Sequence, residues 1–156
     1  MEDGSGLFES NSILRYVART GAAHHNLYGA NHLEASQIDS YLDVGLYLET
    51  IVVPWIYPIF GYIALDEVQR DKSKTNVKNT LLSLNKHLQG RKHFVGSEVT
   101  IADIGLVCSL LNPFKMVFDA EYVSDIPEVV RWFREHIALP EFHSVLGEVK
   151  LLVDTK

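Results

Sequence analysis

The sequence is poor in cysteine and has no long, uninterrupted apolar run. Its 156 residues include a single cysteine, which excludes an internal disulfide. The longest uncharged apolar stretch spans residues 51–65, where two prolines and a glycine interrupt it. That stretch is shorter than the roughly 20 residues that a membrane-spanning helix needs. We therefore expect no disulfide framework and no spanning helix, and the acidic start at Met1–Gly4 does not resemble a secretory signal.

Basic residues are also scarce. Lysine and arginine number 14 against 20 aspartates and glutamates, which gives a net charge of −6. A surface that binds nucleic acid normally shows a basic excess, because each phosphate contact needs a cation. We therefore expect no direct nucleic-acid binding and no membrane association. The absence of disulfides favours a cytoplasmic location.

Cysteine and histidine form no recognisable chemical motif. Cys108 lies in the apolar run 104–111, so we interpret it as a small buried hydrophobe; a reactive thiol would need an exposed, electropositive setting. His24, His25 and His32 lie in a loop-like segment, without the Cys pairs or His-x-x-x-His spacing of a tetrahedral site. We therefore expect no bound metal ion.

Apolar residues recur with a period near 3.6 and not 2, which predicts an all-α fold. The spacing is clearest at Val77, Leu81, Leu84 and Leu88. A two-residue stub at Leu7-Phe8 is the only plausible strand, and Ser10 or Asn11 could cap the first helix. Helices are expected over about 10–20, from 34 to Pro54, over 66–88, from 101 to Pro113, and from about 125 and 140.

The segment before the central helix contains an N-capping box. The Thr100 side chain would accept from the amide of the third helical residue, and the Asp103 carboxylate would reach back to the helix start. Asp103 could instead be a buried catalytic acid, but a cap accounts for it without any ligand. On capping alone, Asp103→Ala should destabilise the fold by about 1–2 kcal/mol.

The order of these elements and three short stretches resemble the glutathione transferase superfamily. The stretches are the Glu-Ser turn at Phe8–Ile13, the capping segment Phe94–Asp103 and the closing turn Glu141–His143. The resemblance implies a remnant of the thioredoxin-like N-terminal domain, one strand and one helix, over residues 1–21. A linker over 22–32 and the C-terminal helical domain over 33–156 would follow.

One branch of the superfamily is more similar still. Val53–Gly61, Val107–Leu111 and above all Phe142–Lys150 resemble the gamma subunit of translation elongation factor 1. The resemblance implies a non-catalytic scaffold that binds the nucleotide-exchange subunit of that factor. It also implies a homodimer that pairs through the first long helix, around Glu34–Tyr47.

The same resemblance implies candidate site residues. In transferases the Glu-Ser pair holds the γ-glutamyl end of glutathione, so Glu9 and Ser10 could contact glutathione, although Ser10 could equally cap a helix. No cofactor is required, and glutathione is the small ligand to consider. Four aromatic residues could line a hydrophobic cleft or could pack into the core: Tyr47, Trp55, Tyr57 and Phe60.

Two other functions stay open from the sequence. One is a glutathione transferase subunit that acts on electrophiles, and the other is an appended assembly domain of a tRNA synthetase complex, which shares this fold. The closing run Leu146–Lys150 favours the elongation factor over both. The family's thiol-activating Tyr, Ser or Cys belongs to a part of the thioredoxin-like domain that has no counterpart here, so catalysis by this chain is not expected.

We predict that the purified 156-residue chain does not conjugate glutathione to an electrophile. The thiolate is the nucleophile, and unassisted glutathione stays largely protonated at neutral pH. A chromogenic conjugation assay checks this against the buffer rate, with an intact transferase as positive control. Turnover well above the buffer rate would mean that the chain supplies its own thiol-activating group.

Overall fold

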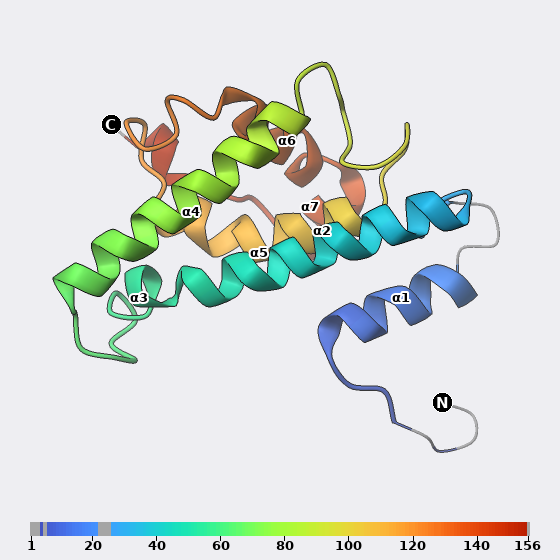
Figure 1. Ribbon diagram of the computed structural model, residues 1–156, viewed down its shortest axis with the longest axis horizontal. Coiled ribbons are helices and arrows are strands. Elements are labelled where there is room, and N and C mark those ends of the chain that lie inside the picture. Colours follow the sequence, from blue (N-terminus) through green and yellow to red (C-terminus); the bar gives the residue numbers. More distant parts are fainter. Residues whose placement is uncertain (1–3, 5, 22–25, 156) are drawn as a thin grey trace.

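The computed structural model describes residues 4, 6–21 and 26–155 (Figure 1). This part of the chain is helical and contains no strand, which confirms the all-α class. None of its helices is long and apolar enough to cross a membrane. The elements are α1 Ser10–Thr20, α2 His32–Ile51, α3 Val53–Ile56, α4 Glu67–His87, α5 Ile101–Met116, α6 Pro127–Ile137, α7 Pro140–Leu146 and the 3-10 turn η1 Leu152–Asp154.

Helices α2 and α5 pack along each other through the middle of the molecule, with α4 and α6 on one side and α1 on the other (Figure 1). Two glycines allow this close approach. A Cβ at Gly105 on α5 would lie only 2.7 Å from Leu42 Cδ2, and one at Gly45 on α2 would lie 3.1 Å from Ser109 Oγ. A larger residue at position 105 would therefore displace the buried Leu42 side chain from its place in the α2–α5 contact.

The core lies among α2, α4, α5 and α6 and is rich in aromatic rings. Phe114 stacks on Phe133 with ring centroids 4.1 Å apart, and Phe94 packs edge-on against Trp132 at 4.8 Å. All four side chains are buried. Aromatic pairs of this kind contribute about 0.5–1.5 kcal/mol each beyond the area that they bury. The first pair fixes α6 against α5, and the second fixes α6 against the loop that precedes α5.

The start of α6 depends on a neighbouring helix. Helices α2 and α4 have N-caps of their own, Asn31 and Asp66. By contrast, the first amides of α6 are satisfied by Asn85 of α4, whose Oδ1 accepts from Glu128 N at 2.8 Å and from Val129 N at 3.2 Å. Because unpaired amides at a helix start are costly when buried, the position of α6 is set by α4.

Polar contacts tie α1 to the rest of the domain. Arg15 Nε donates to Asp39 Oδ1 at 2.6 Å, and the Tyr28 hydroxyl donates to Asp39 Oδ2 at 2.7 Å. Asn11 Nδ2 donates to the Leu42 carbonyl of α2 at 3.3 Å. Burial alone would raise the pKa of Asp39, but the hydrogen bonds from Arg15 and Tyr28 outweigh it and lower that pKa.

The N-terminal segment differs from the sequence-based expectations. Leu7-Phe8 forms no strand, because no strand among the described residues offers it backbone partners, and Phe8 is 80% exposed. Neither Ser10 nor Asn11 is the N-cap. Glu9 holds that position with a φ of 68°, in the left-handed region, while Ser10 begins the helix and Asn11 is used for the contact with α2.

Cys108 is exposed, so its interpretation as a buried hydrophobe was wrong. Cys108 shares a side of α5 with Ile104 and Leu111, which contact the edge of the core and are only half-buried. Partial burial of the sulfur and the nearby charge of Glu49 raise the pKa of the Cys108 thiol. The exposed cysteine is therefore held in its less reactive, protonated form.

We predict that Asp39→Ala loosens α1 without unfolding the domain. The change removes the partners of Arg15 and Tyr28, and a partly exposed pair of this kind contributes up to about 1 kcal/mol. Hydrogen exchange should become faster in residues 10–20 and stay unchanged in α5.

Asp43→Ala, one turn along α2 at an exposed position, is the matched control and should change neither rate. In the native protein the same loosening should set in as the pH falls through the lowered pKa of Asp39, because only the carboxylate form makes these contacts. Equal exchange in Asp39→Ala and in the native protein would contradict this account of how α1 is held.

Candidate functional site

A buried polar cluster lies where α5, α6 and the loop 88–100 meet. We name it the Asp103 cluster: His93, Thr100, Asp103, Trp132 and His136. Asp103 is the third residue of α5 and is fully buried, and Thr100 is the N-cap residue of the same helix. The Thr-x-x-Asp spacing places the carboxylate back over the first turn, so the expected capping box is formed.

Each of the two oxygens of the Asp103 carboxylate accepts two hydrogen bonds. Oδ2 accepts from the Thr100 amide at 3.0 Å and from the Thr100 hydroxyl at 3.2 Å. Oδ1 accepts from the Phe94 amide at 3.1 Å and from the Trp132 indole N–H at 2.9 Å. A buried carboxylate is tolerated when its lone pairs are used in this way. Asp103 therefore joins three segments, namely the loop, α5 and α6.

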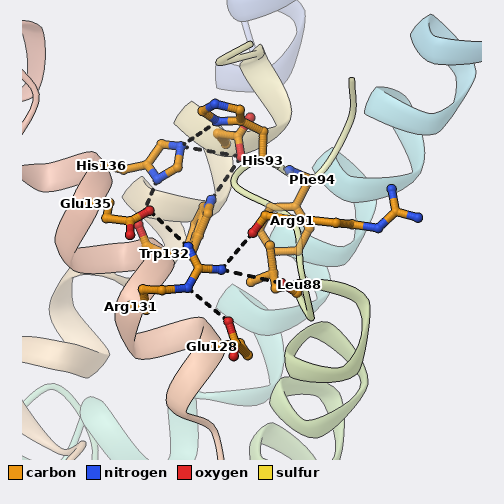
Figure 2. Close-up of polar contacts among 10 residues, drawn as sticks. Leu88, Arg91, His93, Phe94, Glu128, Arg131, Trp132, Glu135 and His136 are labelled. Atoms are coloured by element: carbon orange, nitrogen blue, oxygen red, sulfur yellow. Dashed lines mark hydrogen bonds and ion pairs between the residues drawn. The ribbon is translucent and has the colours of Figure 1, made fainter. Parts of the chain in front are cut away.

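Arg131 holds the other end of the same loop (Figure 2). Its guanidinium donates to the Arg91 carbonyl at 2.7 Å and to the Leu88 carbonyl at 3.4 Å. It also pairs with Glu128 and Glu135, both at 2.9 Å. Because α4 ends just before Leu88, these bonds satisfy carbonyls that have no partner within a helix. The loop 88–100 is thus fixed near both of its ends.

His136 and His93 complete the cluster, and their rings point toward one another in Figure 2. His136 Nδ1 lies 2.7 Å from the Trp132 carbonyl, so Nδ1 carries the hydrogen and Nε2 carries the lone pair of the neutral ring. That Nε2 lies 3.2 Å from His93 Nδ1 and 3.6 Å from Asp103 Oδ1. Burial lowers the pKa of His93, which favours its neutral form.

The geometry of the Asp103 carboxylate favours a structural role over catalysis. A general acid or base must come within hydrogen-bond reach of a substrate. Asp103 has no exposed surface, and its oxygens are occupied by donors from the protein itself. The ring nitrogens of His93 and His136 lie beside this carboxylate, so the cluster brings two nitrogen donors and one oxygen donor together.

Comparison with known proteins identifies the domain. Residues 48–140 match the family model for the C-terminal domain of glutathione S-transferase. The chain belongs to this family. The capping segment that holds Thr100 and Asp103 lies inside the matched residues, so the cluster is built on a part of the sequence that carries the family's pattern.

The transferase-type domain is also similar to elongation factor 1-gamma, as expected from the sequence. It is 34% identical to that protein of Danio rerio over 154 residues, and 36% identical to elongation factor 1-gamma-B of Xenopus laevis over 152 residues. Each match covers 96% of this chain and 33% of the relative, so the chain spans about a third of the relatives' length.

A solved structure has the same fold. The GST-like domain of elongation factor 1-gamma from Saccharomyces cerevisiae superposes with a TM-score of 0.87 at 20% sequence identity. The match covers 97% of this chain and 72% of that chain. The arrangement of helices in Figure 1 is therefore that of a GST-like domain.

Glu9 and Ser10, the candidate glutathione contacts, lie together at the N-terminus of α1 and are both exposed. A helix N-terminus favours a carboxylate, because its first amides and its dipole are positive. No side chain of the described residues caps α1, which leaves those amides accessible. Binding of glutathione by Glu9 and Ser10 stays a prediction.

The four candidate aromatic residues of the transferase-type domain do not line one cleft. Trp55 is buried against the rings of Phe118 and Tyr122. Tyr47 lines a separate hollow between α2 and α4. The other two, Tyr57 and Phe60, lie in the exposed loop after α3, where each packs against Tyr62. Helical spacing could not separate these environments, since they depend on how α3 and the following loop turn.

His93 and His136 were not among the histidines singled out in the sequence. Those were His24, His25 and His32, of which the first two lie outside the described residues. His93 and His136 are 43 positions apart, so no motif of fixed spacing could pair them. The one local signal was the spacing of Trp132 and His136, which puts both on the buried face of α6.

We predict that Asp103→Ala lowers the free energy of unfolding by at least about 3 kcal/mol, because it leaves the Phe94 amide, the Thr100 amide and the Trp132 indole without their acceptor. This exceeds the value expected from capping alone. Asp66→Ala removes the exposed N-cap of α4 and, as the control, should cost only about 1 kcal/mol. Denaturant midpoints measure both losses, and equal losses would reduce Asp103 to a simple cap.

Proposed function

We propose that this chain is a non-catalytic scaffold domain of the translation elongation factor 1 complex, belonging to its gamma subunit. In this role it supports assembly with the nucleotide-exchange subunit. The observation that carries the proposal is the similarity to elongation factor 1-gamma along 96% of the chain. A cytoplasmic location, without direct contact to nucleic acid or membrane, belongs to the same proposal.

An exposed apolar loop supports a role in protein–protein interaction. We name it the aromatic loop: Tyr57, Ile59, Phe60, Tyr62, Ile63 and Leu65. Tyr62 stacks on Phe60 with centroids 5.4 Å apart and meets Tyr57 edge-on at 5.5 Å, so these rings form one patch. Burial of an apolar side chain contributes about 1.5–3 kcal/mol, and contiguous exposed patches usually mark interaction sites.

A second apolar surface supports self-association. The outer face of α1 exposes Ile13, Tyr16 and Val17, and the start of the chain before it exposes Leu7 and Phe8. Helix α2 adds three exposed residues at or near the expected pairing surface: Leu33, Leu46 and Tyr47. We propose a homodimer that uses α2, with residues 7–20 packed on a neighbouring molecule.

A glutathione transferase subunit is the alternative function. It is favoured by the family match and by the exposed Glu9-Ser10 pair at the N-terminus of α1. Turnover of an electrophile by this chain would favour the transferase. Its absence is expected for both functions, because the thiol-activating residue has no counterpart here, so binding to the exchange subunit is the test that separates them.

The proposed function predicts that the purified chain binds the purified nucleotide-exchange subunit and that the aromatic loop contributes to binding. The double variant Phe60→Ser/Tyr62→Ser should weaken binding at least about tenfold, because it removes two aromatic anchors. Val145→Ser, which changes a still more exposed apolar residue on α7, is the control and should bind normally. Titration calorimetry measures the affinities, and light scattering measures the mass of the free chain.

A failure of the native chain to bind the exchange subunit would contradict the proposed function. Binding that survives the double variant would move the interface away from the aromatic loop. A monodisperse monomer in which residues 7–20 resist proteolysis would contradict the homodimer.

A further inference from the structure

We propose that His93, Asp103 and His136 form a binding site for one divalent transition-metal ion, with zinc as the best match. One ligand atom of each residue lies within 4.8 Å of the other two. Asp103 and His136 are buried, and His93 is half-buried. Two imidazoles and one carboxylate are a donor set that zinc takes in proteins, usually with a water molecule in the fourth position.

Two of the three donor–donor distances suit a tetrahedral ion, and the third pair, from His93 to Asp103, lies within 4.8 Å. Ligand atoms bound to zinc at about 2.0–2.1 Å lie about 3.3–3.4 Å apart in tetrahedral geometry. The distance from His93 Nδ1 to His136 Nε2 is 3.2 Å, and that from His136 Nε2 to Asp103 Oδ1 is 3.6 Å. The third ligand, His93, comes from a loop and is partly exposed, so water and an ion can approach from its side.

The hydrogen bonds around the cluster already orient two of the three ligands. The Nδ1–H of His136 donates to the Trp132 carbonyl at 2.7 Å, which aims the lone pair of Nε2 at Asp103 and His93. The indole N–H of the same tryptophan holds Asp103 Oδ1 at 2.9 Å. Outer hydrogen bonds of this kind, to a carbonyl and to the ligating carboxylate, are what fixes ligands at metal sites.

Binding of the ion moves one proton from one nitrogen of His93 to the other and releases none. In the metal-free cluster the His93 Nδ1–H donates to His136 Nε2. When an ion binds, this hydrogen moves to His93 Nε2, and both lone pairs turn to the ion. The ion also brings positive charge to Asp103, whose four hydrogen-bond donors are all neutral groups. Coordination takes the lone pair of Asp103 Oδ1 that the Phe94 amide uses at 3.1 Å, so the electrostatic gain must offset the loss of that hydrogen bond and of the one between the histidines.

Titration of the purified full chain with Co²⁺ and then Zn²⁺ tests the site. We expect one Co²⁺ per chain with the intense visible absorption of four-coordinate cobalt, and its displacement by one Zn²⁺. His93→Ala should weaken Zn²⁺ binding at least about 10–100-fold, the range that loss of an outer partner alone costs. Zn²⁺ should raise the melting temperature of the native chain but not of His93→Ala.

The control variants separate this site from other histidines. His143→Ala removes an exposed histidine of α7, and a second control replaces His24 and His25 together; both should bind Zn²⁺ like the native chain. If His93→Ala fails to fold, His136→Gln provides the same comparison. Absence of binding, a weak six-coordinate cobalt spectrum, or equal affinity in the native chain and His93→Ala would overturn the proposal.

Discussion

The buried carboxylate of Asp103 determines how three segments of the chain fit together. It accepts from the loop through Phe94, from the start of α5 through Thr100 and from α6 through Trp132. None of these donors carries a charge, so the carboxylate is stabilised by directed dipoles and not by an ion pair. Such a group tolerates little displacement, because each donor that moves away leaves a buried charge less well solvated.

Apolar packing supplies the rest of the framework, and it depends on the same geometry. The ring of Trp132 that donates to Asp103 also packs against Phe94, and Phe133 beside it stacks on Phe114 of α5. On the other side of α5, Gly105 lets Leu42 of α2 approach closely. The polar cluster thus sets orientation, and the aromatic and aliphatic contacts around it provide most of the stabilising area.

Much of the fold could be predicted from the sequence, because the local signals agree with the tertiary structure. The periodic leucines of α4, the Thr100–Asp103 box and Pro127 in the first turn of α6 each place a helix correctly. Predictions that depended on distant partners did less well. Leu7-Phe8 lacks a neighbouring strand, and the apolar run around Cys108 gave no sign that one side of α5 is exposed.

Only the part of the candidate site formed by residues close together in the sequence could be predicted. Thr100 and Asp103 are three positions apart, so a capping motif identifies them. Asp103 is more than a cap because it also contacts Trp132 and His136, which lie on a helix about thirty positions later. The spacing of these two residues does not indicate that they contact Asp103. The sequence left cleft lining and core packing open for the aromatic residues for a similar reason, since burial of Trp55 and exposure of Phe60 follow from one turn of the chain.

The fixed loop between α4 and α5 has an evolutionary consequence. Its carbonyls at Leu88 and Arg91 are bound by Arg131, and its amide at Phe94 is bound by Asp103, so an inserted or deleted residue would break contacts at one end or the other. The exposed loop 57–66 has no such anchors to α6. Length variation among relatives should therefore accumulate between α3 and α4, while the segment from Leu88 to Thr100 keeps a constant number of residues.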